Sequence, residues 1–268
     1  MREVQLASLH VLKEIAQICN HNNLRYCLAW GTLIGAVRHH GFIPWDDDID
    51  IFMPRPDYEK LVSYFDEHKE ELLPLQLLSI DNCKDYPYML TRISDSRYFL
   101  DVQNEKPFGL GAFVDIYVLD GVGNTEEEAY KFVSKTCKYP RLMFLSTRKH
   151  YAFGNTKGWL KRIAKIPIFY FAKIMGKQYF VNKILSLVDM NSYTSSKYVG
   201  CAVWVERPYY GVINKDDIEN TIDCKFEDYT FKIPRAYDKL LKIWYGDYMQ
   251  LPPEEDRIYH HLYTAYRK

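Results

Sequence analysis

The sequence lacks a net charge, since its 35 Lys and Arg residues equal its 35 Asp and Glu residues in number. Proteins that bind nucleic acid usually carry a basic excess that neutralises phosphates, so nothing here points to nucleic acid. No apolar run reaches the roughly 20 residues that a membrane-spanning helix requires. The chain opens directly on an amphipathic pattern without the apolar core of a signal peptide, which predicts a protein that is not exported.

Cysteine spacings typical of metal or redox motifs are also absent. No two of the six cysteines are spaced as Cys-x-x-Cys, and none pairs with His at a zinc-finger spacing. Cys19 and Cys27 fall within apolar patterns and are predicted to be buried free thiols. Free thiols without an export signal predict a cytoplasmic protein.

Segments of helical and strand-like periodicity alternate along the chain. Helices are predicted over 3–22, 33–38, 54–65 and 237–245, the last ending at Gly246. Strands are predicted over 24–30 and 48–51, near 75–80, 88–93 and 112–119, and over 198–205 and 229–233.

The most informative segment is 45–51, Trp-Asp-Asp-Asp-Ile-Asp-Ile. Asp48 and Asp50 are two apart on a predicted strand, so they point to one face, roughly 6–7 Å apart. Adjacent carboxylates repel each other, and Mg²⁺ removes that cost when it binds one or two carboxylates and substrate phosphates. Asp46 joins this face if the strand begins early. A solvated acidic turn is disfavoured by the apolar neighbours, and a calcium EF-hand loop by Ile51, which stands where that loop needs Gly.

Polar residues in apolar surroundings mark further candidates. Gly31 and Thr32 follow a predicted strand and precede a helix, where backbone N–H groups and a hydroxyl face a phosphate. Asp115 lies in an apolar strand, where an unpaired carboxylate is costly to bury. It either completes a three-carboxylate metal site or forms a buried ion pair with Arg92. Arg38, Arg55 and Arg92 are candidate phosphate ligands, because a guanidinium binds phosphate through two parallel hydrogen bonds, and the alternative for each is a structural or surface role.

One stretch of the chain is strongly basic. From Ala129 to Val188 there is no Asp or Glu, but there are 13 Lys or Arg residues. The pattern predicts a helical insertion near 125–190, which begins with a capping box of Thr125 and Glu128 and is broken at Pro167. Its aromatic and basic residues predict contact with an anionic membrane surface. Alternatively, the aromatic residues form the insertion's own core, or the basic charge offsets the acidic remainder of the chain.

Several of these segments together resemble a known family. Residues 31–38 (Gly-Thr-Leu-Ile-Gly-Ala-Val-Arg) and 42–50 (Phe-Ile-Pro-Trp-Asp-Asp-Asp-Ile-Asp) resemble the signature of the LicD family. These are bacterial phosphocholine transferases related to fukutin and fukutin-related protein. The resemblance continues at 113–117 and returns at 245–254, so it covers nearly the whole chain. The family resembles the nucleotidyltransferase superfamily, in which Gly-Ser or Gly-Gly precedes Asp-x-Asp. This sequence has Gly-Thr instead, and the gap from it to Asp48 is slightly longer than in that pattern, so either Asp46 or Asp48 begins the metal pair.

The resemblance implies an α+β fold with a nucleotidyltransferase-like mixed sheet, in a single domain over 1–268 that carries the helical insertion. It implies a metal-dependent enzyme that moves phosphocholine, or a related alcohol phosphate, from CDP-choline to a sugar hydroxyl and releases CMP. The acceptor would be a cell-surface glycan such as teichoic acid, capsule or lipopolysaccharide. A lipid-linked acceptor would bring the protein to the inner face of the membrane. A true nucleotidyltransferase using a nucleoside triphosphate and a non-catalytic glycan- or nucleotide-binding module remain alternatives.

Residue roles follow from the same resemblance. The expected catalytic residues are Asp48, Asp50 and Asp115, with Asp115 as proton acceptor for the attacking hydroxyl. The expected ligands of Mg²⁺ or Mn²⁺ are Asp46, Asp48, Asp50 and Asp115. The expected substrate-binding residues are Gly31, Thr32, Arg38, Trp45 and Arg92. Trp30, Trp45 and Trp204 are candidates for an aromatic enclosure around a trimethylammonium group.

Overall fold

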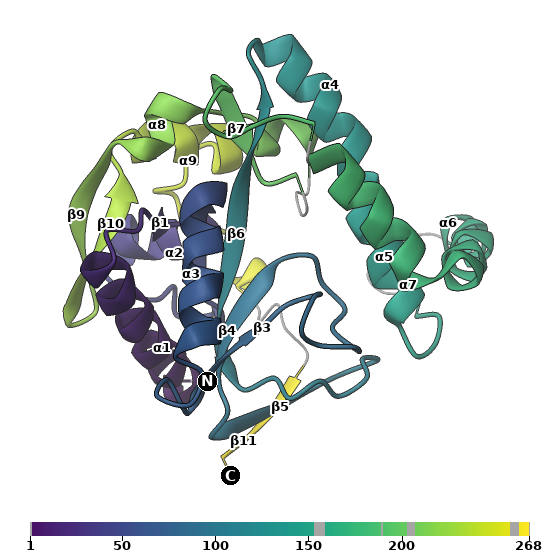
Figure 1. Cartoon of the computed structure of the whole chain (residues 1–268), viewed down its shortest axis with the longest axis horizontal. Coiled ribbons are helices and arrows are strands. Elements are labelled where there is room, and N and C mark those ends of the chain that lie inside the picture. The colour runs from purple at the N-terminus through teal and green to yellow at the C-terminus, as the bar shows by residue number, and fades with distance from the viewer. Residues whose placement is uncertain (1, 153–158, 189, 203–206, 258–262, 268) are drawn as a thin grey trace.

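A mixed sheet forms the centre of an α+β fold in the computed structural model (Figure 1). The structure describes residues 2–152, 159–188, 190–202, 207–257 and 263–267. The sheet follows the order β1 (Cys27–Leu28), β2 (Asp50–Pro54), β6 (Ala112–Gly123), β4 (Thr91–Asp95) and β3 (Leu75–Leu78). The pair β2–β6 is parallel and the other pairs of this path are antiparallel. The far end of β6 pairs with β7 (Tyr198–Gly200), which pairs with β8 (Ile213–Asn214).

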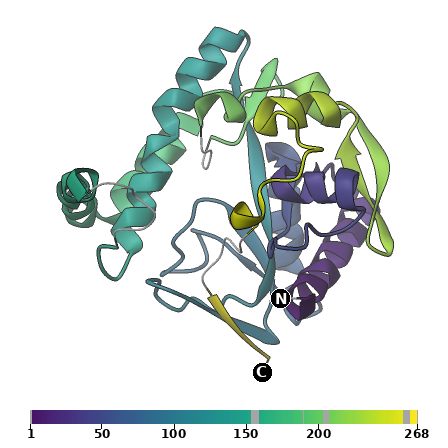
Figure 2. The same ribbon diagram turned by 180° about the vertical axis from the view of Figure 1, so that it is seen from behind.

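The 12-residue strand β6 organises the molecule, because it pairs with β2, β4 and β7. Every residue of β6 except the half-buried Tyr117 is buried, as expected for a strand covered on both faces. Helices α1 (Arg2–His21) and α3 (Arg55–Glu67) cover the face seen in Figure 1, whereas α2 (Trp30–Ile34) and α9 (Tyr237–Tyr245) are better seen from behind in Figure 2. The main core contains the apolar stripe of α1, including Leu12 and Ile15, which are fully buried.

The predicted helical insertion is present between β6 and β7. It comprises α4 (Glu126–Thr136), α5 (Lys138–Thr147), α6 (Trp159–Ala164) and α7 (Ile166–Val188). The capping box of Thr125 and Glu128 is confirmed at the start of α4. The predicted break at Pro167 is present, because α6 ends at Ala164 and α7 begins at Ile166, with Pro167 in its first turn, where a missing N–H costs nothing. Helix α7 is itself interrupted at Gly176, whose φ of 75° is available to glycine.

The remaining elements surround this framework. They are the π-helical turn η1 (Gly35–His39), the hairpin β9 (Thr221–Phe226) and β10 (Tyr229–Pro234), the pair β5 (Tyr98–Val102) and β11 (Tyr263–Arg267), α8 (Lys215–Glu219), η2 (Pro208–Gly211) and η3 (Glu254–Asp256). Helix α9 ends at Gly246 as predicted, with a φ of 68°. Within the described ranges, no helix has the length and hydropathy required to cross a membrane.

Two sequence-based strand boundaries need correction near the acidic segment. The strand predicted over 24–30 is only Cys27–Leu28, and Trp30 already begins α2. The strand predicted from Asp48 begins at Asp50, so Asp48 lies in the preceding loop. In the segment where polar and apolar residues alternate, only the residues from Asp50 onward pair with β6.

Candidate metal centre

A row of charged residues crosses three adjacent strands. Asp50 on β2 lies opposite Asp115 on β6, and Asp115 lies opposite Arg92 on β4. Residues opposite each other on neighbouring strands point to the same face of the sheet. The register therefore places two carboxylates and one guanidinium side by side, although they are far apart in the sequence.

Asp48 completes a group of three carboxylates with Asp50 and Asp115. One carboxylate oxygen from each of the three lies within 4.8 Å of the other two. Asp50 is 6% exposed, and its Oδ1 has no hydrogen-bond partner within the described part of the chain. Burial, together with repulsion from Asp48 and Asp115, raises the pKa of Asp50 well above its ordinary value. A buried, unsatisfied carboxylate among like charges fits a hard divalent cation, which neutralises the charges and takes the free oxygen as a ligand.

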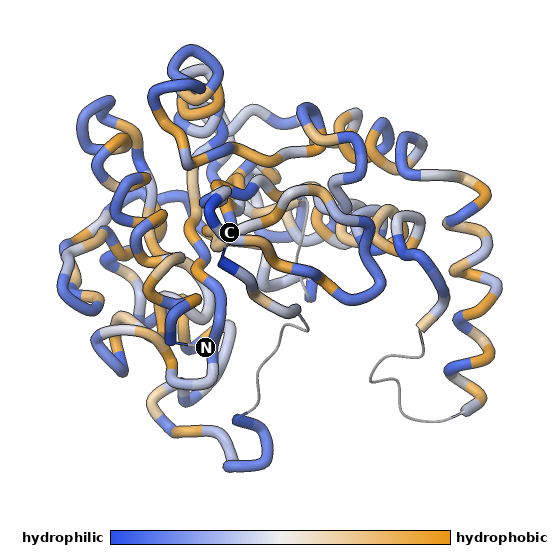
Figure 3. Tube along the Cα trace, turned by 90° about the horizontal axis from the view of Figure 1, so that it is seen from below, coloured by the Kyte–Doolittle hydropathy of each residue, from blue (hydrophilic) through white to orange (hydrophobic). Residues whose placement is uncertain are grey.

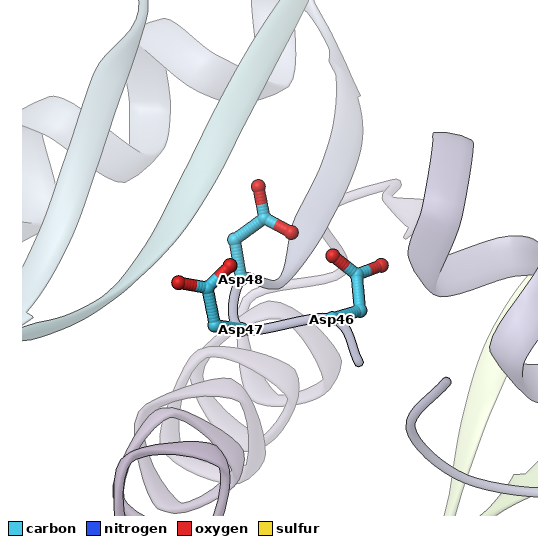
Figure 4. A group of neighbouring side chains, drawn as sticks. All are labelled: Asp46, Asp47 and Asp48. Carbon is cyan, nitrogen blue, oxygen red and sulfur yellow. The ribbon is translucent and has the colours of Figure 1, made fainter. Parts of the chain in front are cut away.

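A second acidic group shares Asp48 with the first. Oxygens of Asp46, Asp47 and Asp48 also lie within 4.8 Å of one another, and Figure 4 shows the three side chains spreading from one short loop. The sequence placed Asp46 on the strand face with Asp50 only if the strand began early. The strand begins at Asp50, and Asp46 is grouped with Asp48 and with Asp47, which the sequence interpretation omitted.

The acidic loop is held by two distant elements. Gln5 of α1, which is buried, donates from Nε2 to the carbonyl of Asp46 at 2.7 Å. Tyr263 of β11 donates from its hydroxyl to the carbonyl of Asp47 at 3.3 Å. Burial, and next the nearby Asp47, raises the pKa of Tyr263, so the phenol stays protonated as a donor. Neither residue was identified from sequence, because a side chain that binds a distant backbone carbonyl leaves no local pattern.

Gly31 and Thr32 lie inside the first turn of α2 rather than in a turn ahead of it. Thr32 is buried, and its Oγ1 accepts a hydrogen bond from the backbone N–H of Asp50 at 2.9 Å. A Cβ at Gly31 would lie 2.7 Å from Oδ2 of Asp46. Both residues therefore shape the acidic site directly: Thr32 fixes the start of β2, and Gly31 leaves room for the Asp46 carboxylate.

Arg92 forms the ion pair with Asp115 that the sequence left open. Its Nε donates to Oδ1 of Asp115 at 2.6 Å and its Nη2 to Oδ2 at 3.3 Å. The guanidinium lies between the rings of Tyr88 and Phe113, with its carbon 4.2 Å from each ring centre. Arg92 is 4% exposed, so its two hydrogen bonds to Asp115 are buried. Asp115 belongs both to this pair and to the carboxylate group.

Arg38 and Trp45 both contact the C-terminal part of the chain. Arg38 donates from Nη1 to the carbonyls of Tyr248 and Gln250. The guanidinium of Arg257 lies 5.5 Å from the ring centre of Trp45. The segment after α9 is thus attached to the loop that precedes the acidic residues. Trp204, a further aromatic candidate, lies outside the described residues.

An aromatic group lies next to the carboxylates on the same face of the sheet. Phe52 and Tyr117 follow Asp50 and Asp115 by two residues, and they are opposite each other in the register. Trp30 packs on both rings, with centre distances of 5.1 Å to Phe52 and 6.0 Å to Tyr117. Burial, and next the charges of Asp50 and Asp115, raises the pKa of Tyr117, in keeping with this proximity.

Trp244 of α9 completes this aromatic group, with its ring centre 4.6 Å from that of Trp30. Trp30 has a positive φ of 44°, a strained conformation for a large residue, which tends to occur at functional sites. Sequence reasoning proposed Trp30 and missed the other three members. The alternation that identified Asp115 would have pointed to Tyr117, since residues two apart share a face.

Comparison with known proteins gives a family model over about half of the chain and a relative that matches over 99% of it. Residues 23–157 match the model of the LicD/FKTN/FKRP nucleotidyltransferase domain. The lipopolysaccharide cholinephosphotransferase LicD of Haemophilus influenzae is 32% identical over 269 residues, which cover 99% of this chain and 97% of that protein. Two uncharacterised proteins, from Rickettsia prowazekii and Rickettsia typhi, are each 36% identical over 69 residues, or 26% of this chain. Those matches cover 23% and 20% of the two proteins.

Proposed function

The chain belongs to the LicD family, and from that premise we propose that it is a metal-dependent transferase that moves phosphocholine, or a related alcohol phosphate, from a CDP-linked donor to a glycan hydroxyl. The observation that carries the proposal is the convergence of Asp48, Asp50 and Asp115 within 4.8 Å. The Haemophilus influenzae relative, of which 97% is covered, carries choline phosphate and lipopolysaccharide in its name. We therefore take CDP-choline as the first donor to test and lipopolysaccharide as the first acceptor, ahead of teichoic acid or capsule.

The three carboxylates are assigned to one divalent cation, Mg²⁺ or Mn²⁺, because all their ligand atoms are oxygens. When bound, the cation would neutralise charge on the donor pyrophosphate, as in phosphoryl transfer generally. Asp50 supplies an oxygen without another partner, and Asp115 supplies one whose orientation Arg92 fixes. Asp46 and Asp47 add negative charge in the loop before β2. They would bind a second cation or form the rim of the site.

The attacking hydroxyl needs a group that accepts its proton. The sequence suggested Asp115, but both oxygens of that carboxylate already accept hydrogen bonds from the buried Arg92. Asp50 is almost fully buried, whereas Asp48 is half-buried. We assign the proton to Asp48, because an acceptor sugar can reach it from solvent.

The donor is placed along the same face of the sheet. Its pyrophosphate would lie near Gly31 and Thr32, which border the carboxylates. Within the aromatic group beside the carboxylates, Phe52 and Trp244 are buried, so the half-buried Trp30 and Tyr117 would offer ring surface to a trimethylammonium group or to a sugar. Arg38 and Trp45 would line the rim, where they also hold the C-terminal segment.

Product analysis with two labels tests this function. Purified protein is incubated with Mg²⁺, lipopolysaccharide and CDP-choline labelled in the choline, and in parallel with CTP labelled at the α-phosphate. Label in the glycan and free CMP are expected from CDP-choline alone. Label from CTP in the product, with pyrophosphate released, would replace the proposal by nucleotidyl transfer. Calorimetry that detects no Mg²⁺-dependent binding of either nucleotide would instead indicate a non-catalytic module.

A further inference from the structure

A helical arm projects from the insertion. It consists of α6 and the first part of α7, residues 159–175, and it ends where Gly176 interrupts the helix. The arm lies at the edge of the molecule, beyond α5, in both Figure 1 and Figure 3. Figure 3 shows hydrophobic segments recurring along its length. This part of the chain is remote from the carboxylates and has no role in the proposed chemistry.

Among the residues that the structure describes, protein covers one side of the arm. Phe169 and Ala172, three residues apart, are buried. Phe169 meets the ring of Tyr151 at 5.5 Å, and Ala172 joins a small core with Met143 of α5. Lys173 also donates from Nζ to the carbonyl of Arg148. These contacts fix the side of the arm that faces the insertion.

The opposite side is apolar and exposed. Leu160, Ile163, Phe171 and Ile174 are 65%, 53%, 50% and 83% exposed. Leu160 and Ile163 are three residues apart on α6, and Phe171 and Ile174 are three residues apart on α7, so each pair shares one face of its helix. Trp159 and Tyr170 are 68% and 58% exposed and widen the stripe, since each precedes one of these residues. A contiguous apolar stripe of this kind marks an interaction surface, whereas single exposed apolar residues do not.

Charge decides which partner fits this surface. The stretch from Ala129 to Val188 contains 13 basic residues and no acidic one. On the arm, Arg162 and Lys165 are exposed. A basic surface around apolar and aromatic side chains complements anionic lipid head groups. A second copy of the arm would bring the same positive charge and repel it.

We propose that residues 159–175 form a membrane-docking helix that lies in the interface of an anionic lipid surface. Trp159, Ile163 and Ile174 would enter the boundary between head groups and acyl chains, and the exposed Arg162 and Lys165 would add electrostatic attraction to the anionic surface. The helix lies on the surface and does not cross it, in agreement with the hydropathy of the described helices. This inference is independent of the transferase proposal.

Vesicle co-sedimentation tests the proposal. The full chain should sediment with phosphatidylcholine vesicles that contain phosphatidylglycerol, should not sediment with pure phosphatidylcholine, and should be released by salt. Ile174→Glu should weaken partitioning at least about tenfold, because it places a charge on the inserted face. Leu6→Glu is the matched control, since Leu6 is an exposed apolar residue on another helix, and it should partition like wild type.

A charge-reversal pair tests the electrostatic part. Arg162→Glu with Lys165→Glu should weaken partitioning by more than about 25-fold, since each basic residue near an anionic surface contributes about fivefold. Lys69→Glu with Lys225→Glu changes the net charge equally at exposed positions elsewhere and should have little effect. Fluorescence gives a second readout: anionic vesicles should shift Trp emission to the blue, and Trp159→Phe should remove most of that shift.

Three results would overturn the docking helix. One is no binding to anionic vesicles at low salt, and another is binding that Ile174→Glu and the arm's charge reversal leave unchanged. The third is a wild-type dimer that Ile174→Glu converts to a monomer without any vesicle binding, which would make the stripe a contact between copies. All variants are first checked for wild-type melting temperatures and for transfer to a soluble acceptor, so that failure of docking is distinct from failure of the enzyme.

Discussion

Replacing Asp50 by Asn tests the metal assignment most directly, because the change removes one charge and almost no volume. The Asp50 carboxylate is buried, one of its oxygens is unsatisfied in the described structure, and three other aspartates raise its pKa. If this charge stabilises the reacting phosphate through a cation, its loss should lower the turnover number by on the order of a hundredfold. The metal-free protein should keep its stability or gain some, since a buried charge among like charges has been neutralised.

The pH dependence of the free energy of unfolding gives a second test of the role of Asp50. The pKa of Asp50 is raised in the folded state, so folded protein binds this proton more tightly than the unfolded chain does. Its contribution to the free energy of unfolding is therefore full below about pH 4, the pKa of an unfolded aspartate. That contribution is lost as the pH rises toward the folded pKa, at up to about 1.4 kcal/mol per pH unit. Asp50→Asn should remove this loss in EDTA, and Mg²⁺ or Mn²⁺ should oppose it in wild type.

The assay combines urea denaturation, with EDTA or with metal, and single-turnover transfer. Asp120→Asn is the matched control. Asp120 lies on β6, and its carboxylate is also buried but pairs with Arg55 at 2.7 Å. This control should lose about 2 kcal/mol in either condition, because a charged partner is left behind. Near-normal turnover of Asp50→Asn at saturating Mg²⁺, or a loss of stability in EDTA equal to that of the control, would refute the reasoning.

Other predictions follow from single contacts. Asp115→Asn should abolish transfer and also lower the free energy of unfolding by about 3 kcal/mol, since it leaves Arg92 buried without its anion; melting curves and single-turnover rates check both effects, and an unchanged melting temperature would contradict it. Gly31→Ala should weaken binding of Mn²⁺ in calorimetry, because the new Cβ would lie 2.7 Å from Oδ2 of Asp46; wild-type affinity would show that Asp46 lies outside the metal centre. Arg38→Ala should speed proteolysis after α9, because the bonds to the carbonyls of this segment are lost; unchanged cleavage would show that other contacts hold it.

The tertiary structure gave partners to several residues that the sequence had identified. Arg92, which the sequence offered as a phosphate ligand or as the partner of Asp115, is buried against Asp115. Thr32, which was expected to face a phosphate, accepts a hydrogen bond from the backbone N–H of Asp50. Residue type and neighbours indicate that a group is functional, but its partner depends on strand register and on distant segments. The contributions of Gln5 and Tyr263 were invisible for the same reason, since each binds a loop carbonyl more than 40 residues away along the chain.

The sequence by itself determined the helices with clear periodicity, the capping box before α4, the end of α9 and the acidic run around Asp48. Those features depend on residues that are neighbours in the chain, so local patterns suffice to predict them. Only the tertiary structure decided that Asp50 lies opposite Asp115, that Asp115 pairs with Arg92, and that the stripe with Ile174 faces solvent. Register and burial depend on which segments pack together, and that is set by the free energy of the whole fold.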